Sequence, residues 1–275
     1  MPQTEAERVA RSAYDNPDAD WFYSQIWGGQ DIHLGLYREP GESIAVASRR
    51  TMDHMVGKLG ERAVSDVVDL GSGYCGAARF LSSRYGASVL ALNVSREQNQ
   101  RARALNGEAG MGENITVTEG TYNSVPAEDA SFDLAWSQDA FLHSDRRDVA
   151  VAEAARVLRP GGDLLFTDPM SADDTMPEQL DPVLDRLRLP SLGSPAQYRA
   201  HAAEAGLIEV GFEDLSSQLA THYGRVLEES RKRMEELRQS ASDDYLQHMM
   251  RGLQNWVDAG SRGLLAWGIF HFRKP

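Results

Sequence analysis

The chain has 275 residues, a single cysteine and a formal net charge of −13 at pH 7. This length permits a substantial buried core, either in one large α/β domain with an elaboration or in two small domains. One cysteine excludes an intramolecular disulfide. The acidic charge argues against nucleic acid or an anionic membrane as a partner, because binding to phosphates relies on clustered lysines and arginines. We therefore expect a small-molecule substrate.

No apolar stretch approaches the roughly 20 residues that cross a bilayer. Residues 1–13 are polar and charged, unlike a secretory signal. These features predict a cytoplasmic protein, and we expect no metal ion. The sequence leaves both a monomer and a homodimer open.

The N-terminal segment, residues 5–37, is rich in aromatic side chains. Its run at residues 21–29 reads WFYSQIWGG and ends in two glycines, which predicts a helix that stops and turns. Apolar residues at helical spacing predict an amphipathic helix over residues 42–59. Because residues 1–40 precede the predicted sheet, we expect them to form a lid that excludes water from a site.

From residue 64 onward, short apolar runs alternate with helical patterns. Strands are predicted at residues 64–70, 88–92, 115–118, 132–136 and 163–167, and helices at 77–84, 95–110 and 147–158. This alternation predicts a doubly wound, mainly parallel, Rossmann-like α/β sheet. Residues 159–162, Arg-Pro-Gly-Gly, are predicted to end a helix and turn into the next strand.

The remaining patterns complete a predicted seven-stranded single domain. Helices are predicted at residues 178–189 and 194–205, a strand at 207–215, a solvated helix face at 222–246 and a last strand at 264–272. We expect a sheet core over residues 60–170, a helical cap over 171–262 and the last strand within 263–275.

A glycine-rich turn follows the first predicted strand. Gly71, Gly73 and Gly76 permit a sharp turn and a close approach of backbone to a ligand. The same spacing fits a dinucleotide fold, so it does not select the ligand. Asp69, just before the glycines, suits a cationic amino-acid ligand and would repel a pyrophosphate. Together these residues favour a positively charged nucleoside ligand.

The second predicted strand ends at Asn93. In such sheets this position commonly hydrogen-bonds ribose hydroxyls, and an amide can donate and accept such bonds, as can Gln98 one turn later. The alternative role for Asn93 is to cap the following helix, but Ser95 is available for that role. We therefore interpret Asn93 as a ligand contact.

The fourth predicted strand leads into Asp139 and His143. Residues at the carboxyl ends of strands in an open α/β sheet face the ligand crevice, so both are candidates for substrate contact. The alternative for His143 is a packed structural histidine, which is the commoner role of a lone histidine.

Several blocks of the chain resemble bacterial sarcosine/dimethylglycine N-methyltransferases. The similarity is carried by residues 18–37, 92–95, 136–144, 166–170, 221–227 and 265–272. The resemblance implies an enzyme that takes methyl groups from S-adenosyl-L-methionine and adds them to sarcosine or dimethylglycine, forming the osmoprotectant glycine betaine. Cys75 departs from the pattern, because a glycine is expected there.

This family is similar in turn to phosphoethanolamine methyltransferases and cyclopropane fatty-acid synthases, and the comparison implies site residues. The implied cofactor contacts are Ile32, His33, Asn93, Gln98, Thr121, Tyr122 and Gln138. Together with Asp69, Gly71, Ser72 and Gly73 of the glycine turn, and with Val94, they form the predicted cofactor site. On the substrate side the resemblance implies His143 and Met170.

Methyl transfer to an amine needs a free lone pair, so the substrate must lose a proton. His143 is the predicted acceptor, and Asp139 is predicted to orient it or to meet the charge that grows on the nitrogen. Tyr23 and Trp27 are predicted to enclose a methylated ammonium through cation–π contacts.

The substrate carboxylate needs a cationic partner, and an arginine fork fits it best. Candidates in the family-like segments are Arg49, Arg50, Arg199 and Arg262, of which we favour Arg262 just before the last strand. Each is also compatible with a plain surface arginine.

Two alternatives remain at this point. The first is a methyltransferase of the same fold that acts on another small amine or on a natural-product hydroxyl. The second is a nucleotide-binding oxidoreductase, or a non-catalytic binding module, built on the same sheet.

Overall fold

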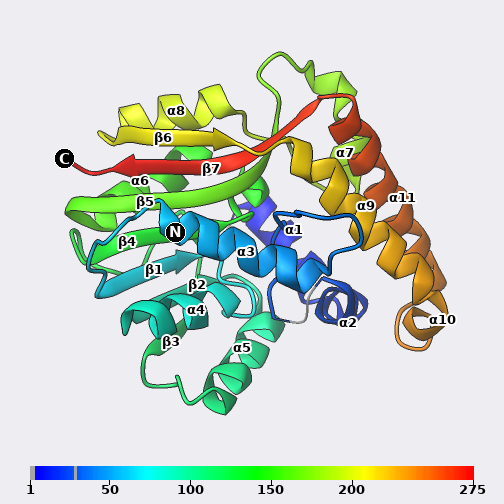
Figure 1. Cartoon of the computed structure of the whole chain (residues 1–275), viewed down its shortest axis with the longest axis horizontal. Helices are drawn as coiled ribbons and strands as arrows, with labels where there is room; N and C mark the ends of the chain where they lie inside the picture. Colours follow the sequence, from blue (N-terminus) through cyan, green and yellow to red (C-terminus); the bar gives the residue numbers. More distant parts are fainter. Residues whose placement is uncertain (1–3, 28–29) are drawn as a thin grey trace.

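The computed structural model describes residues 4–27 and 30–275. Its centre is a seven-stranded sheet in the order β3-β2-β1-β4-β5-β7-β6 (Figure 1). The first five strands pair in parallel, and β7 runs antiparallel to both β5 and β6. The strands are β1 (Asp66–Leu70), β2 (Ser88–Asn93), β3 (Ile115–Glu119), β4 (Phe132–Gln138), β5 (Leu158–Ser171), β6 (Ile208–Asp214) and β7 (Leu265–Arg273). The predicted Rossmann-like class is therefore confirmed.

Helices cover both faces of the sheet, which is why its central strands are nearly continuous apolar runs. They are α3 (Ile44–Gly57), α4 (Gly76–Tyr85), α5 (Arg96–Glu108), α6 (Arg147–Val157) and α8 (Pro195–Glu204). One apolar core joins α6 and α8 to β4 and β5, and another joins α3 and α4 to β1 and β2. The sheet is thus a rigid platform whose strand ends position loops.

The remaining helices gather beyond the end of the sheet towards which β1 and β2 point (Figure 1). They are α1 (Glu5–Tyr14), α2 (Pro17–Ile26), α7 (Asp181–Asp185), α9 (Ser217–Lys232), α10 (Met234–Leu237) and α11 (Asp243–Ser261). A third apolar cluster packs α2 against α7, α9 and α11. None of the helices within residues 4–27 and 30–275 is both long and apolar enough to span a membrane.

Three local predictions were wrong or incomplete. The helix predicted at residues 178–189 is broken into a short 3-10 turn, Pro177–Gln179, and α7, because Pro182 lacks the amide that would continue a longer helix. Residues 159–162 lie inside β5 and not in a turn, and the pairing of β5 with β4 is irregular there. The stretch predicted as a solvated helix face, residues 222–246, is solvated on one side only, since α9 buries Tyr223 and Val226. The two glycines predicted to stop α2 lie outside the described residues.

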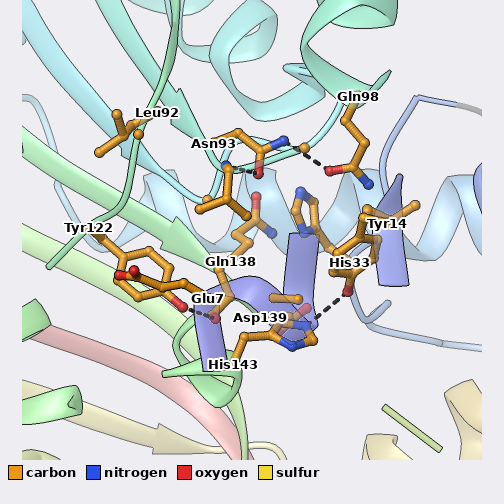
Figure 2. A pocket seen from close by; sticks show the side chains of 17 residues that line it. Glu7, Tyr14, His33, Leu92, Asn93, Gln98, Tyr122, Gln138, Asp139 and His143 are labelled. Carbon is orange, nitrogen blue, oxygen red and sulfur yellow. Dashed lines mark hydrogen bonds between the residues drawn. The ribbon is translucent and has the colours of Figure 1, made fainter. Parts of the chain in front are cut away.

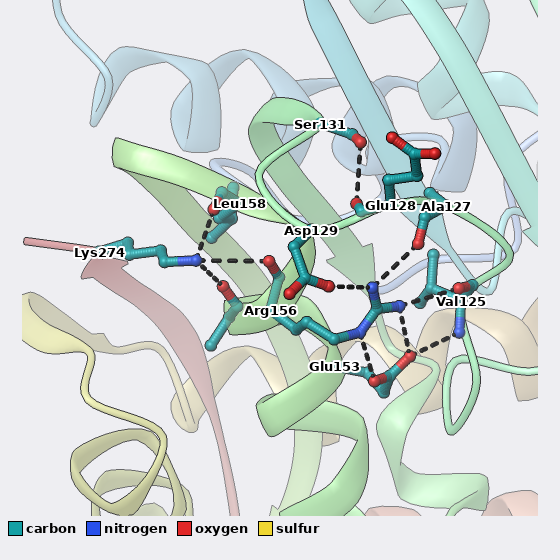
Figure 3. A network of polar contacts seen from close by, with 10 residues as sticks. Val125, Ala127, Glu128, Asp129, Ser131, Glu153, Arg156, Leu158 and Lys274 are labelled. Carbon is teal, nitrogen blue, oxygen red and sulfur yellow. Dashed lines mark hydrogen bonds and ion pairs between the residues drawn. The ribbon is translucent and has the colours of Figure 1, made fainter.

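A polar network fixes the connection between β3 and β4 (Figure 3). Arg156 of α6 donates to the carbonyls of Val125 and Ala127 at 3.0 and 2.9 Å, and it pairs with Asp129 and Glu153. The guanidinium lowers the pKa of the Glu153 carboxyl by hydrogen bonding. The network therefore holds in place the loop that carries Thr121 and Tyr122.

Candidate functional site

A cavity of about 620 Å³ lies at the carboxyl ends of β1, β2 and β4. Predicted site residues from distant parts of the chain meet on its wall (Figure 2). Those that line it are Ile32, His33, Gly71, Gly73, Asn93, Val94, Gln98, Tyr122, Gln138, Asp139 and His143.

Other predicted residues lie behind this wall or elsewhere. Asp69 and Ser72 are buried in the glycine turn, and Thr121 hydrogen-bonds Glu7. Tyr23 and Trp27 are buried in the apolar cluster of the helical cap. Met170 is fully buried in the core on the α6 side of the sheet and does not line the cavity.

The predicted arginines are placed outside the cavity. Arg49 covers the ring of Phe80 at 4.3 Å, and Arg199 pairs with Glu209 at 3.1 Å. Arg50 pairs with Glu42, and Arg262 is exposed at the end of α11. Family-like sequence around an arginine did not indicate whether its side chain reaches the cavity.

The glycine turn brings backbone against the cavity. Gly71 has a φ of +87°, and a Cβ there would lie 2.4 Å from the Cβ of Ala140. Cys75, the N-cap of α4, is buried and also left-handed, with a φ of +62°. A side chain in this conformation costs about 1–2 kcal/mol, which gives a physical reason why glycine was expected at this position.

Two carboxylates lie beside the turn. Oδ2 of Asp69 and Oδ1 of Asp31 are buried and have no hydrogen-bond partner among the described residues. A Cβ on Gly76 would lie 1.6 Å from Asp31 Oδ1, so only glycine lets this carboxylate reach the start of α4. Burial, reinforced by Asp31, raises the pKa of Asp69 to about 7. A cationic group nearby would stabilise the charged form of both carboxylates.

Amide side chains at the ends of β2 and β4 offer unused donors (Figure 2). Asn93 Nδ2 donates to Gln98 Oε1 at 2.9 Å, and Gln138 Oε1 accepts from Trp136 at 3.1 Å. The Nε2 groups of Gln98 and Gln138 are buried without an acceptor in the described chain. Ser95, as predicted, caps α5 by accepting from the amide of Gln98, which leaves Asn93 available to a ligand.

Helix α1 forms part of the cavity wall, a role that the sequence patterns did not assign to individual residues. Glu7 accepts from Asn123 Nδ2 at 2.8 Å, and Arg11 Nε donates to the Val94 carbonyl at 2.9 Å. Asp15 accepts from the Ser95 hydroxyl at 2.6 Å. These contacts hold α1 over the ends of β2 and β3.

A tyrosine and histidine pair faces the cavity, and sequence reasoning found only the histidine. The hydroxyl of Tyr14 and Nε2 of His143 are 2.9 Å apart (Figure 2). Burial, and then the charges of Arg186 and Arg147, lower the pKa of His143 to about 3. Burial raises the pKa of Tyr14 well above 10. Both groups are thus neutral at physiological pH, so one ring nitrogen of His143 carries a lone pair.

Asp139 lines the same cavity but is engaged by three donors. Its Oδ2 accepts from the Leu34 amide at 2.7 Å, and its Oδ1 accepts from Thr167 Oγ1 at 2.9 Å and from Trp267 Nε1 at 2.8 Å. No hydrogen bond joins it to His143 among the described residues. The carboxylate therefore fastens the N-terminal segment to β5 and β7.

Comparison with known proteins identifies the family. Residues 68–166 match a family model described as a methyltransferase domain. The chain is 47% identical to the sarcosine/dimethylglycine N-methyltransferase of Halorhodospira halochloris, over 98% of this chain and 97% of that protein. The chain belongs to the sarcosine/dimethylglycine N-methyltransferase family.

Two further matches agree with this family. The glycine/sarcosine/dimethylglycine N-methyltransferase of Actinopolyspora halophila is 48% identical over 98% of this chain, which spans about half (47%) of that longer protein. A crystal structure from Galdieria sulphuraria, described as a candidate sarcosine dimethylglycine methyltransferase, is 41% identical with a TM-score of 0.89, and covers 95% of this chain and 98% of its own. The family resemblance noted in the sequence is therefore confirmed.

Proposed function

We propose that this protein transfers a methyl group from S-adenosyl-L-methionine to the amine nitrogen of sarcosine or dimethylglycine and so forms glycine betaine. The observation that carries the proposal is the neutral Tyr14–His143 pair on the wall of the cavity, 2.9 Å between its polar atoms. Membership of a family whose relatives are named for these amines supports the choice of substrate.

The residues present fit the proposed cofactor. Buried donors on Gln98 and Gln138 suit the hydroxyls and carboxylate of S-adenosyl-L-methionine, and the unpartnered carboxylates of Asp31 and Asp69 suit its positive charge. The turn at Gly71 lets the backbone approach it. When bound, this cofactor supplies a methyl group activated by a positively charged sulfur.

The side chains of this protein prepare the acceptor amine. The amine must present a lone pair, so its proton has to leave before or during the reaction. Neutral His143 has a lone pair to take that proton, and Tyr14 shares a hydrogen bond with it. Helix α1, held over the strand ends by Glu7 and Arg11, limits the access of water. The protein thus orients and desolvates the amine.

A labelled-methyl assay tests the proposed function. The purified protein is incubated with methyl-labelled S-adenosyl-L-methionine and, separately, with sarcosine, dimethylglycine, glycine and phosphoethanolamine. We expect labelled glycine betaine from dimethylglycine, and labelled dimethylglycine or betaine from sarcosine. Transfer to neither of these two amines would contradict the proposal, and transfer to phosphoethanolamine alone would favour another acceptor class.

The pH dependence of cofactor binding tests the role of Asp69. Because the pKa of Asp69 is raised to about 7, its carboxyl group is partly protonated near neutral pH when the site holds no cation. A cationic ligand favours the carboxylate, so affinity is expected to fall below pH 7 by up to about tenfold per pH unit. The Asp69→Asn variant should bind the cofactor weakly and without this dependence, as measured by calorimetry from pH 5.5 to 8.5.

The stability of the ligand-free protein changes in the opposite sense. The pKa of Asp69 is higher in the folded protein than in the unfolded chain. The contribution of its protonated side chain to the free energy of unfolding is therefore fully present below about pH 4 and is lost as the pH rises through about 7. Asp69→Asn should therefore raise the Tm of the ligand-free protein at pH 8 but not at pH 4. Glu61→Gln, at an exposed carboxylate, is the matched control. If cofactor affinity in the unaltered protein did not depend on pH, Asp69 would not be the group that binds the cationic cofactor.

A further inference from the structure

A second cavity, of about 1010 Å³, shares Tyr14 with the first. It lies between α1 and α2 on one side and, on the other, α11 and the residues that follow α7, and Tyr23, Arg186 and Tyr245 line it. Because Tyr14 lines both cavities, a group bound near Arg186 in the second cavity can reach the Tyr14 side of the Tyr14–His143 pair.

Arg186 is a buried cation without an acidic partner. Only 6% of the residue is exposed, and within residues 4–27 and 30–275 no carboxylate lies within 4.0 Å of its guanidinium. The one hydrogen bond that its guanidinium makes in the described chain is a long contact to Met249 Sδ at 3.7 Å, and its Nε has no partner. A guanidinium has five N–H donors, and burying such a charge without an acceptor is costly.

The surrounding helices make room for this side chain. Aromatic rings of Tyr223, Trp256 and Trp27 lie 5.2, 5.3 and 5.8 Å from its Cζ. A Cβ on Gly252 would lie 2.5 Å from Arg186 Cγ. Glycine inside a helix such as α11 costs about 1 kcal/mol relative to alanine, so the fold keeps the arginine in place at the expense of helix stability.

Neighbouring donors are unsatisfied as well. Nε1 of Trp27 and Nε2 of His222 are buried without an acceptor in the described chain, and the two rings are 5.3 Å apart. His222 Nδ1 accepts from the Gly35 amide at 3.1 Å, so the ring proton is on Nε2. Unused donors around Arg186 therefore have no matching acceptor in the part of the chain that the structure describes. An anion with oxygen lone pairs would satisfy these donors.

We propose that Arg186 binds the carboxylate of the amino-acid substrate and thereby holds its amine against Tyr14 and His143. This inference rests on the proposed function, because it assigns the carboxylate of that same substrate. A planar guanidinium fits a carboxylate through two parallel hydrogen bonds, and the aromatic rings beside it suit a methylated ammonium.

Substrate binding at Arg186 also acts on the proton acceptor. After burial, the positive charge of Arg186 is the largest cause of the lowered pKa of His143. A bound carboxylate offsets that charge, so His143 becomes a stronger base when the substrate arrives. The arginine thus positions the substrate and couples its binding to proton acceptance.

The experiment compares Arg186→Met and Arg186→Lys with Arg251→Gln, a control at an exposed arginine of α11. Calorimetry measures the binding of dimethylglycine to the protein saturated with S-adenosylhomocysteine, which needs no turnover. Initial rates are measured with dimethylglycine and with N,N-dimethylethanolamine, which has no carboxylate. Circular dichroism and the Tm report folding.

For Arg186→Met we expect at least a 100-fold loss of dimethylglycine affinity and of kcat/KM, with S-adenosylhomocysteine affinity within threefold and an unchanged or higher Tm. Arg186→Lys should recover part of the loss, and Arg251→Gln should behave like the unaltered protein. The preference for dimethylglycine over dimethylethanolamine should disappear in Arg186→Met.

Two results would overturn this assignment. One is a loss below threefold in dimethylglycine binding, and the other is an equal loss for both amines, which would indicate a purely structural role. If Arg186→Met does not fold, the same criteria apply to Arg186→Lys. Tight binding of dimethylglycine that depends on Arg186 without methyl transfer would refute the proposed function and leave the carboxylate site standing.

Discussion

Replacing His143 with alanine is expected to lower kcat by about 10²- to 10⁴-fold while S-adenosylhomocysteine affinity stays within about threefold. The reason is that the unprotonated ring nitrogen of His143 is the proposed proton acceptor, whereas the amide donors proposed for the cofactor are on Gln98 and Gln138. Because the pKa of His143 is lowered to about 3, its neutral form prevails above about pH 4. The profile of kcat/KM against pH should therefore show no step near 6.5.

Tyr14→Phe and His54→Gln complete the test. Tyr14→Phe removes only the hydroxyl of the pair and should cost less than the loss of His143. His54 bonds Glu213 on the outer part of the protein, so His54→Gln should leave kcat within twofold. If His143→Ala kept full kcat, or if its S-adenosylhomocysteine affinity fell as much as its rate, the assignment as proton acceptor would be wrong.

Asp139→Ala is expected to destabilise the protein by about 3 kcal/mol or more, because each buried group left unsatisfied costs about 1–3 kcal/mol. Three donors lose their acceptor, namely the Leu34 amide, the Thr167 hydroxyl and the Trp267 indole. Asp139 has a φ of +53°, which asparagine tolerates. Asp139→Asn should keep the bonds at Oδ1 but set an amide against the Leu34 N–H, at a smaller cost.

Urea unfolding of both variants measures these costs, with Asp145→Asn, at an exposed aspartate, as the control. The stability loss is expected in the absence of any ligand, and a loosened N-terminal segment should also raise proteolytic cleavage within residues 30–43. A loss of turnover with full stability would instead favour the sequence-based hypothesis that Asp139 acts on the reacting groups.

The sheet was predictable because its signals are local. Apolar runs at β1 and β2, the turn after Asp69 and the cap at Ser95 each act within a few residues, and the structure places all of them as expected. The strand ends then brought Asn93, Gln138 and His143 to one cavity, as the topology of a parallel sheet requires.

The substrate side was less predictable because it is assembled from distant helices. Tyr14 and His143 are 129 positions apart, and no periodic pattern relates them. Arg186 is buried by contacts with Trp27, which follows α2, and with residues of α9 and α11, so its environment depends on tertiary packing. Arg262 lies in a family-like segment, yet packing leaves it exposed at a helix end. The reason why glycine was expected at Cys75 likewise lies in its left-handed φ angle, which the sequence does not show.

The most direct test of this account is a crystal structure with S-adenosylhomocysteine and dimethylglycine bound. We expect the amine nitrogen of dimethylglycine to lie beside the Tyr14–His143 pair, its carboxylate on the guanidinium of Arg186, and the nucleoside between Asn93 and Gln138. Dimethylglycine bound away from His143, or no bound dimethylglycine at saturating concentration, would contradict the proposed function.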